Sequence, residues 1–169
     1  METLKAILTR RSIRKYSHDQ IPGEYLDILI KAAMHAPSAR NRQPWHFIII
    51  GDRQLLERLS DVSTSWEMLK EASHAIVVCG DKEIEDTESF IIQDCAAATQ
   101  NILLAAHDLN IGTVWLGVHP RKGRLVPLKQ ILRIPHHILP VSMISLGKPN
   151  ESREQPERFL TERIHFDKW

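Results

Sequence analysis

The chain has 169 residues, of which 43% are hydrophobic and 25% are charged, a composition typical of one globular domain with a sizeable core. Its 22 lysines and arginines face 21 acidic residues, which leaves a net charge of +1. This balance argues against a dedicated nucleic-acid-binding protein, whose affinity needs a broad excess of basic residues.

The first third of the chain predicts two helices, a loop and a strand. Apolar residues at helical spacing predict a short amphipathic helix over residues 2–10. Pro22 suits the first turn of a second helix, whose apolar face continues to Ala33. Residues 36–44, APSARNRQP, break the periodicity and predict a loop that leads into a buried strand at 45–51.

The rest of the chain alternates helices and strands. We expect a helix at 53–60, a strand at 74–81, a helix at 88–109, a strand at 111–118, a helix at 124–132 and a strand at 139–147. The segment 88–109 holds no Gly or Pro and is apolar almost all round, so we expect a buried central helix. The pattern predicts a single α+β domain over residues 1–169, with a mainly antiparallel sheet of about four strands wrapped by helices.

The C-terminal tail, about residues 148–169, is polar and cannot form a core alone. It nevertheless contains Phe166 and Trp169, so we expect it to pack on a second subunit. The two cysteines, Cys79 and Cys95, lie in apolar surroundings without CxxC spacing, which predicts buried, reduced thiols. We find no apolar run long enough to cross a membrane and no secretory signal core, and we therefore expect a cytoplasmic protein.

The basic stretch RRSIRKYSHDQIP, residues 10–22, is the local exception to the neutral charge. In a helix Arg10 and Arg14 are one turn apart, and in an extended chain Arg10, Ser12 and Arg14 share one face. Either conformation brings guanidinium groups and a hydroxyl together, as binding of a phosphate monoester requires. A solvated basic surface has the same composition, and the stretch alone favours that simpler interpretation.

Three further polar stretches leave a similar choice open. The APSARNRQP loop offers Ser38, Asn41 and Gln43 as hydrogen-bonding groups between stiffening prolines, which suits a planar heterocycle or an ordinary helix-to-strand connection. In GTVWLGV, Trp115 can form a flat wall for a ligand or simply pack in the core. The charged tail is, by itself, typical of a solvated segment.

No familiar catalytic or metal-binding motif occurs. Nine histidines are scattered along the chain, and the adjacent His136 and His137 are expected to point apart. There is no HExxH or Cys/His ligand spacing, no GxSxG elbow, no Walker loop and no GxGxxG. We therefore expect no metal site, and we expect neither a serine hydrolase nor a dinucleotide-binding fold of the Rossmann type.

Four stretches, in their order and spacing, resemble one family. The chain resembles the short type of the FMN-dependent nitroreductase family in the stretches RRSIRKYSHDQIP, LIKAAMHAPSARNRQPWHFIII, QDCAAATQNILLAAHDLNIGTVWLGV and SLGKPNESREQPERFLTERIHFDKW. The resemblance runs from about residue 4 to the C-terminus, and the first two stretches and GTVWLG are its most specific parts. It implies a nitroreductase-like fold and an intertwined homodimer with FMN bound at the subunit interface.

The resemblance also implies which residues bind FMN. The basic stretch and Arg158 would hold the phosphate and ribityl chain, with Arg14 toward the flavin ring. The loop before the first strand would come from the partner chain, and GTVWLG would supply backbone contacts to the ring. The implied residues are Arg10, Arg11, Ser12, Arg14, Pro37, Ser38, Ala39, Asn41, Gln43, Trp115, Leu116, Gly117, Lys148 and Arg158.

The implied activity is ping-pong hydride transfer from NADH or NADPH, through FMN, to nitroaromatics, quinones or similar small-molecule acceptors, with no catalytic side chain. Other flavin chemistry on the same scaffold, such as dehalogenation or flavin destruction, and a non-enzymatic flavin-binding protein remain alternatives. Larger family members carry an Asn and Lys pair before the second strand. The sequence STSWEMLKEASH does not align with that pair, and Lys70 is either its substitute or a surface residue.

Overall fold

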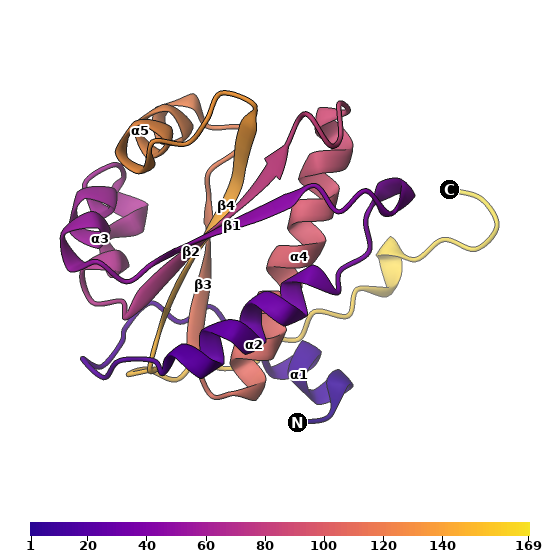
Figure 1. Cartoon of the computed structure of the whole chain (residues 1–169). Coiled ribbons are helices and arrows are strands. Elements are labelled where there is room, and N and C mark those ends of the chain that lie inside the picture. The colour runs from indigo at the N-terminus through magenta and orange to yellow at the C-terminus, as the bar shows by residue number, and fades with distance from the viewer.

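A computed structural model describes all 169 residues of the chain (Figure 1). The helices are α1 (Thr3–Thr9), α2 (Gly23–Met34), α3 (Arg53–Ser60), α4 (Glu88–Asp108) and α5 (Lys122–Leu132). The strands are β1 (Trp45–Ile50), β2 (His74–Asp81), β3 (Gly112–Gly117) and β4 (Ile138–Gly147). Three short 3-10 helices, η1 (Ala39–Asn41), η2 (Thr64–Lys70) and η3 (Thr161–Arg163), complete the structure.

The four strands form one antiparallel sheet in the order β1-β2-β4-β3. The two long strands, β2 and β4, occupy the centre and are almost completely buried, because helices cover both faces of the sheet. β1 and β3 are the edge strands. This arrangement confirms the predicted α+β fold with a four-stranded antiparallel sheet.

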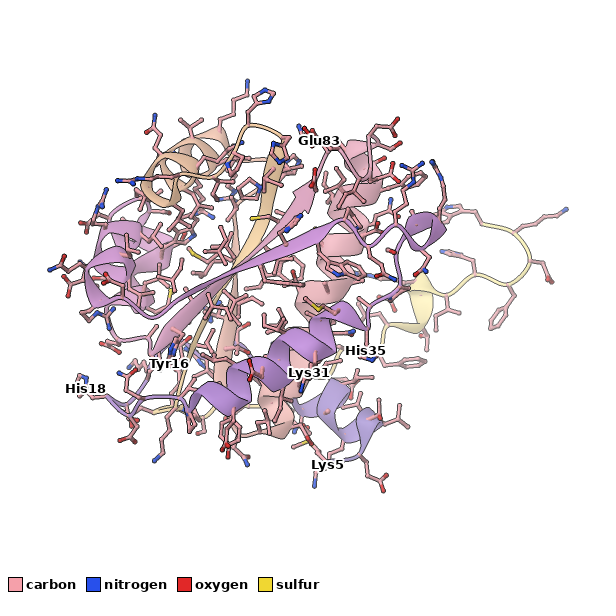
Figure 2. All side chains as sticks on the ribbon, in the orientation of Figure 1. Lys5, Tyr16, His18, Lys31, His35 and Glu83 are labelled. Atoms are coloured by element: carbon pink, nitrogen blue, oxygen red, sulfur yellow. The ribbon has the colours of Figure 1, made fainter.

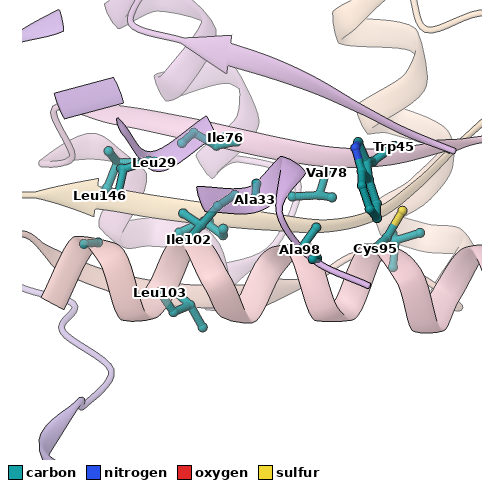
Figure 3. Packing of buried hydrophobic residues seen from close by; sticks show 14 of the residues in the cluster. Leu29, Ala33, Trp45, Ile76, Val78, Cys95, Ala98, Ile102, Leu103 and Leu146 are labelled. Carbon is teal, nitrogen blue, oxygen red and sulfur yellow. The ribbon is translucent and has the colours of Figure 1, made fainter. Parts of the chain in front are cut away.

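One face of the sheet carries α2 and α4. Figure 3 shows Leu29 and Ala33 of α2 and Ala98 and Ile102 of α4 packed together against the strands. Eight residues of α4 are buried, as expected for a central helix that contacts α2 on one side and the sheet on another. The prediction of a buried central helix is therefore confirmed, with the helix ending at Asp108.

The opposite face carries α3, α5 and η2. Its core is centred on Trp66, which is fully buried and comes from η2, an element that the sequence pattern did not predict. Helix α5 begins at Lys122, two residues before the expected start at residue 124. Pro127 therefore lies inside the helix instead of near its start. Because proline has no N–H, it donates no hydrogen bond to the preceding turn.

The C-terminal tail leaves the body of the domain and extends beyond α4 (Figure 1). Every residue from Ser152 onward is exposed. Phe166 and Trp169 are 85% and 101% exposed, so no part of the same chain covers them. By contrast, both cysteines are buried and unpaired, as the sequence predicted.

Candidate functional site

The basic stretch forms an extra, short edge alongside β3. Ser12 forms a parallel bridge with Thr113, and the Ile13 N–H donates to the Thr113 carbonyl at 2.9 Å. This contact requires a glycine at position 112, because a Cβ there would lie 2.8 Å from Cγ2 of Ile13. The basic stretch is thus fixed to the sheet rather than left as a solvated surface segment.

Arg10 carries a positive charge that nothing in the chain neutralises. Its side chain is half-buried and has neither an ion pair nor a hydrogen bond within the chain. Its pKa is lowered, first by burial and then by the positive charges of Arg11 and Arg158. A partly desolvated cation surrounded by like charge is a binding position for an anion.

The same positive field acts on the neighbouring end of α4. His107, in the last turn of that helix, has a pKa lowered first by burial and then by Arg10. Its Nε2 lies 2.8 Å from the Thr9 hydroxyl. Both residues line a hollow of about 210 Å³ together with Arg10, Thr113 and Arg153. The hollow is polar and positively charged, which suits a phosphate group.

The other basic residues have different surroundings. The Arg11 guanidinium donates to the carbonyls of Leu8, at 2.9 Å, and Glu154, at 3.0 Å, and so ties α1 to the tail. Arg14 is exposed and lines a separate hollow of about 440 Å³, which Lys70 of η2 also lines. Lys70, the suggested substitute for the family's lysine, therefore lies near Arg14.

Lys148 is not brought to this cluster. Its ammonium group pairs with the Asp19 carboxylate at 3.0 Å, and both side chains are exposed. Arg158 contributes to the positive field at Arg10, as noted above, although its own side chain is exposed in the tail. The structure thus groups Arg10, Arg11 and Arg158 and leaves Lys148 in a surface ion pair.

The loop after α2 is folded on itself. The Ser38 hydroxyl accepts from the Gln43 N–H at 3.0 Å, and the Gln43 side-chain amide donates to Asn41 at 2.8 Å. The Ala39 N–H donates to the Asp94 carboxylate of α4 at 3.0 Å. Asn41 and Gln43 have positive φ angles, which this tight turn requires. The predicted loop residues are therefore held in one arrangement, with Ser38 and Ala39 half-buried.

An ion pair between an exposed arginine and a buried glutamate holds the loop further. Arg42 donates to the Ile84 carbonyl at 2.7 Å and lies 3.5 Å from the fully buried carboxylate of Glu85. Neither residue was predicted as functional, because one arginine in a polar loop and one glutamate in a turn carry no signal at sequence level. Pro37, at the start of the loop, is exposed.

The loop and the arginine cluster lie at opposite ends of α4. Asp94 anchors the loop and His107 borders the arginine cluster, 13 positions further along the same helix. At 1.5 Å per residue this spacing corresponds to about 20 Å along the helix axis. One chain therefore does not bring the predicted loop residues and the predicted arginines to a single ligand-sized site.

The GTVWLG block forms β3, on the same edge as the basic stretch. Trp115 is 37% exposed, whereas Leu116 is buried in the core that faces α5. The Gly117 carbonyl accepts a hydrogen bond from Arg124 at 2.9 Å, and Arg124 also donates to the hydroxyl of Ser65 at 2.5 Å. Arg124, which the sequence did not single out, thus joins α5, β3 and η2 beside the exposed tryptophan.

Comparison with known proteins decides the family. Residues 7–66 and 63–148 match the model described as the Nitroreductase family. The chain belongs to the nitroreductase family. The expected nitroreductase-like fold is thereby confirmed, and the family match runs from within α1 to the end of β4.

Close relatives of this nitroreductase-family chain come from archaea and bacteria. A protein of Archaeoglobus fulgidus with the provisional name NADH dehydrogenase/NAD(P)H nitroreductase is 50% identical, over 99% of both chains. A crystal structure from Parabacteroides distasonis with the same provisional name is 40% identical, with a TM-score of 0.95 over 99% of this chain and 98% of that one. A crystal structure from Desulfovibrio desulfuricans, with the provisional name nitroreductase and described as a complex with FMN, is 29% identical, with a TM-score of 0.87 over 100% and 98% of the chains.

No helix of the structure combines the length and the apolar character that crossing a bilayer requires.

Proposed function

We propose that this chain is an FMN-dependent NAD(P)H oxidoreductase. The observation that carries the proposal is the half-buried Arg10, which lacks an anionic partner and lies in the field of Arg11 and Arg158. The phosphate of FMN carries about two negative charges near neutral pH and would neutralise this cluster. The relatives agree with this assignment, since one structure is described as an FMN complex and a Bacillus subtilis relative, 27% identical over 91% of this chain, is named FMN reductase (NADPH).

The residues present fit the cofactor at both of its ends. Arg10 and Arg158 would hold the phosphate, and the Ser12 hydroxyl would add a hydrogen bond from the segment fixed to β3. Arg14 would supply positive charge for the reduced state, which is anionic, and so favour reduction. The exposed face of Trp115 would bound the pocket beside the ring.

When bound, FMN supplies hydride chemistry, accepting two electrons from NADH or NADPH and passing them to an acceptor such as a nitroaromatic or a quinone. We propose that donor and acceptor occupy the same pocket in turn, which gives ping-pong kinetics. The chain's own role is to bind, to orient and to set the electrostatics, so no side chain needs to act as acid, base or nucleophile.

We also propose that two copies of the chain form the complete site. The loop anchored at Asp94 and the arginine cluster beside His107 lie about 20 Å apart within one chain, a distance set by the rise of α4. In a two-fold dimer the loop of one chain can reach the cluster of the other. The exposed Phe166 and Trp169 give the tail an apolar surface for the same interface.

The first test of this function is spectroscopic. Protein purified without added cofactor should be yellow, release FMN on denaturation, and lose its flavin absorbance under anaerobic conditions when NADH or NADPH is added. A colourless protein whose thermal stability does not rise with added FMN would rule the function out. A panel of nitroaromatics, quinones and halogenated aromatics then identifies the acceptor class. The halogenated arm is included because an iodotyrosine deiodinase of Haliscomenobacter hydrossis is 26% identical over 88% of this chain.

The second test separates the two halves of the proposed site. Arg10→Ala and Asn41→Ala are each expected to bind FMN weakly as homodimers. After the two variants are unfolded and refolded together, random pairing should restore roughly a quarter of the sites, since each mixed dimer regains one intact site. Failure to recover any binding would show that Arg10 and Asn41 act within one chain or not at all.

A further inference from the structure

Four potential metal ligands lie together at the end of the sheet opposite the basic stretch. Ligand atoms of Asp81, Glu83 and His137 all lie within 4.8 Å of one another. His46 joins them, with its Nε2 3.4 Å from the Asp81 carboxylate. Figure 2 shows Glu83 at the far end of the molecule from Tyr16, which follows the arginines of the basic stretch. This cluster is therefore separate from the arginine cluster proposed to hold the FMN phosphate, although it adjoins the loop at 36–44.

The backbone fixes the positions of these groups. Asp81 pairs with Ile138 across β2 and β4, and the Lys82 N–H donates to the His137 carbonyl at 3.1 Å. The Asp81 N–H donates to the carbonyl of Pro44, one residue before β1. Three strands thus bring the ligands together. Asp81 and Glu83 are two positions apart, but His46 and His137 lie 35 or more positions from them in sequence, so no short motif marks the cluster.

The carboxylate of Asp81 is oriented for a further partner. Its Oδ1 accepts a hydrogen bond from the Glu83 N–H at 2.8 Å, which leaves Oδ2 on the side of His46. Asp81 itself is 9% exposed. Glu83 and His137 are more exposed, with Nδ1 of His137 4.0 Å from Oε1 of Glu83, so their side chains can rotate inward.

A hollow adjoins the cluster. It has a volume of about 380 Å³, and its lining includes His46, Asp81 and His137 together with Cys79 and the loop before β4. The nearby Lys129 forms no ion pair with the carboxylates; its ammonium group donates to the carbonyls of His136 and Ile138 at 3.2 and 2.9 Å.

We propose that His46, Asp81, Glu83 and His137 bind one divalent transition-metal ion of the zinc class. Two imidazoles and two carboxylates are a ligand set that zinc uses, whereas calcium and magnesium prefer oxygen ligands alone. Bonds of about 2.0–2.2 Å place neighbouring ligand atoms of a tetrahedral site roughly 3.3–3.6 Å apart. The distance from His46 to Asp81 already meets this requirement. The side chains of Glu83 and His137, whose ligand atoms lie 4.0 Å apart, must rotate to bring all four ligands to these distances.

The expected consequence is local stabilisation. A metal here would cross-link β1, the turn after β2 and the loop before β4. The same turn carries Ile84 and Glu85, which hold Arg42 of the proposed cofactor loop. Binding of zinc to the folded state alone raises the temperature of unfolding in proportion to the logarithm of free zinc above the dissociation constant.

The experiment uses the full-length, FMN-loaded chain without a histidine tag, dialysed against a chelator and then titrated with zinc sulfate. Zinc binding is measured by competition with a chromophoric chelator and by the metal content after gel filtration. We expect one zinc ion per chain and a saturable rise in the temperature of unfolding. His137→Ala should weaken binding at least about 10-fold, since even changes beyond the ligands cost 10–100-fold.

His136→Ala is the matched control, because it removes the neighbouring, exposed imidazole from the same loop. It should leave zinc affinity unchanged. Glu83→Gln, at an exposed position, should weaken binding while leaving the fold and the FMN content intact. The proposal is overturned if the wild-type chain retains less than one zinc ion, or if His136→Ala and His137→Ala weaken binding equally, which would show adventitious surface binding only.

Discussion

Replacing Arg10 with alanine tests the proposed phosphate site most directly. Arg10 is half-buried, has no partner within the chain and lies among like charges, so its guanidinium group is free to bind an anionic ligand. Charge-assisted hydrogen bonds contribute about 1.5–3 kcal/mol each. Since every 1.4 kcal/mol is a factor of ten, we expect the dissociation constant of FMN to rise roughly 10- to 150-fold.

The same substitution should not destabilise the protein without cofactor. The pKa of Arg10 is lowered in the folded state, so folding disfavours its charged form, and removing the charge relieves that penalty. We therefore expect the apoprotein of Arg10→Ala to unfold at the same or a slightly higher temperature. Loss of FMN affinity together with unchanged apoprotein stability would separate a binding role from a structural one.

The assay is a titration of apoprotein with FMN, followed by quenching of flavin fluorescence. Arg58→Ala is the matched control, because Arg58 is an exposed arginine of α3 and forms no ion pair. Arg10→Lys should show an intermediate loss, since lysine keeps the charge but not the two-pronged geometry. Wild-type FMN affinity in Arg10→Ala would remove Arg10 from the site and refute the reasoning.

Three further predictions concern assembly, packing and thiol chemistry. Phe166→Ala/Trp169→Ala should shift the sedimentation coefficient toward that of a monomer, and an unchanged value would exclude the tail from the interface. Gly80→Ala should lower the free energy of unfolding by about 1–3 kcal/mol, because its Cβ would lie 2.0 Å from a buried side chain. In the same denaturant titration Gly123→Ala, with open space around it, should raise stability by roughly 0.5–1 kcal/mol. Burial raises the pKa of Cys79 to about 12. At pH 8 a thiol reagent should therefore modify Cys79 only as fast as the protein unfolds, and faster modification would contradict the buried position.

The raised thiol pKa also gives stability a pH dependence. The unfolded chain ionises its cysteines near pH 8.5, whereas the folded chain keeps Cys79 protonated to about pH 12. The stabilisation is fully present below pH 8.5 and is lost as the pH rises toward 12.

Hydrophobic periodicity predicted the architecture because the fold depends on it. The apolar runs at β1, β2 and β4 and the almost uniformly apolar α4 have few other ways to be buried than in a sheet covered by helices. Element η2 escaped prediction because it is short and its three apolar residues, Trp66, Met68 and Leu69, show no helical or strand period; only the tertiary structure shows Trp66 and Leu69 to be buried.

The candidate site was harder to predict from the sequence, because the role of each charged residue depends on which side chains lie beside it in the fold. The charge of Lys148 resembled a site residue, but the structure gives it Asp19 as a partner at the surface. Arg42 and Arg124 gave no signal, because their roles arise from a buried glutamate and a serine hydroxyl that lie 43 and 59 positions away in sequence. The histidine and carboxylate cluster was missed because three strands assemble it.

The sheet separates two cores that share little except backbone, and this separation has an evolutionary consequence. The core beneath α2 and α4 supports both the loop anchored at Asp94 and the arginine cluster beside His107. Substitutions in the core around Trp66, on the other face, change the total stability without reshaping α4. A substitution on the Trp66 face can therefore offset a loss of stability caused by a substitution on the α4 face. We expect such compensating substitutions to accumulate more freely on the Trp66 face than on the face that carries α4.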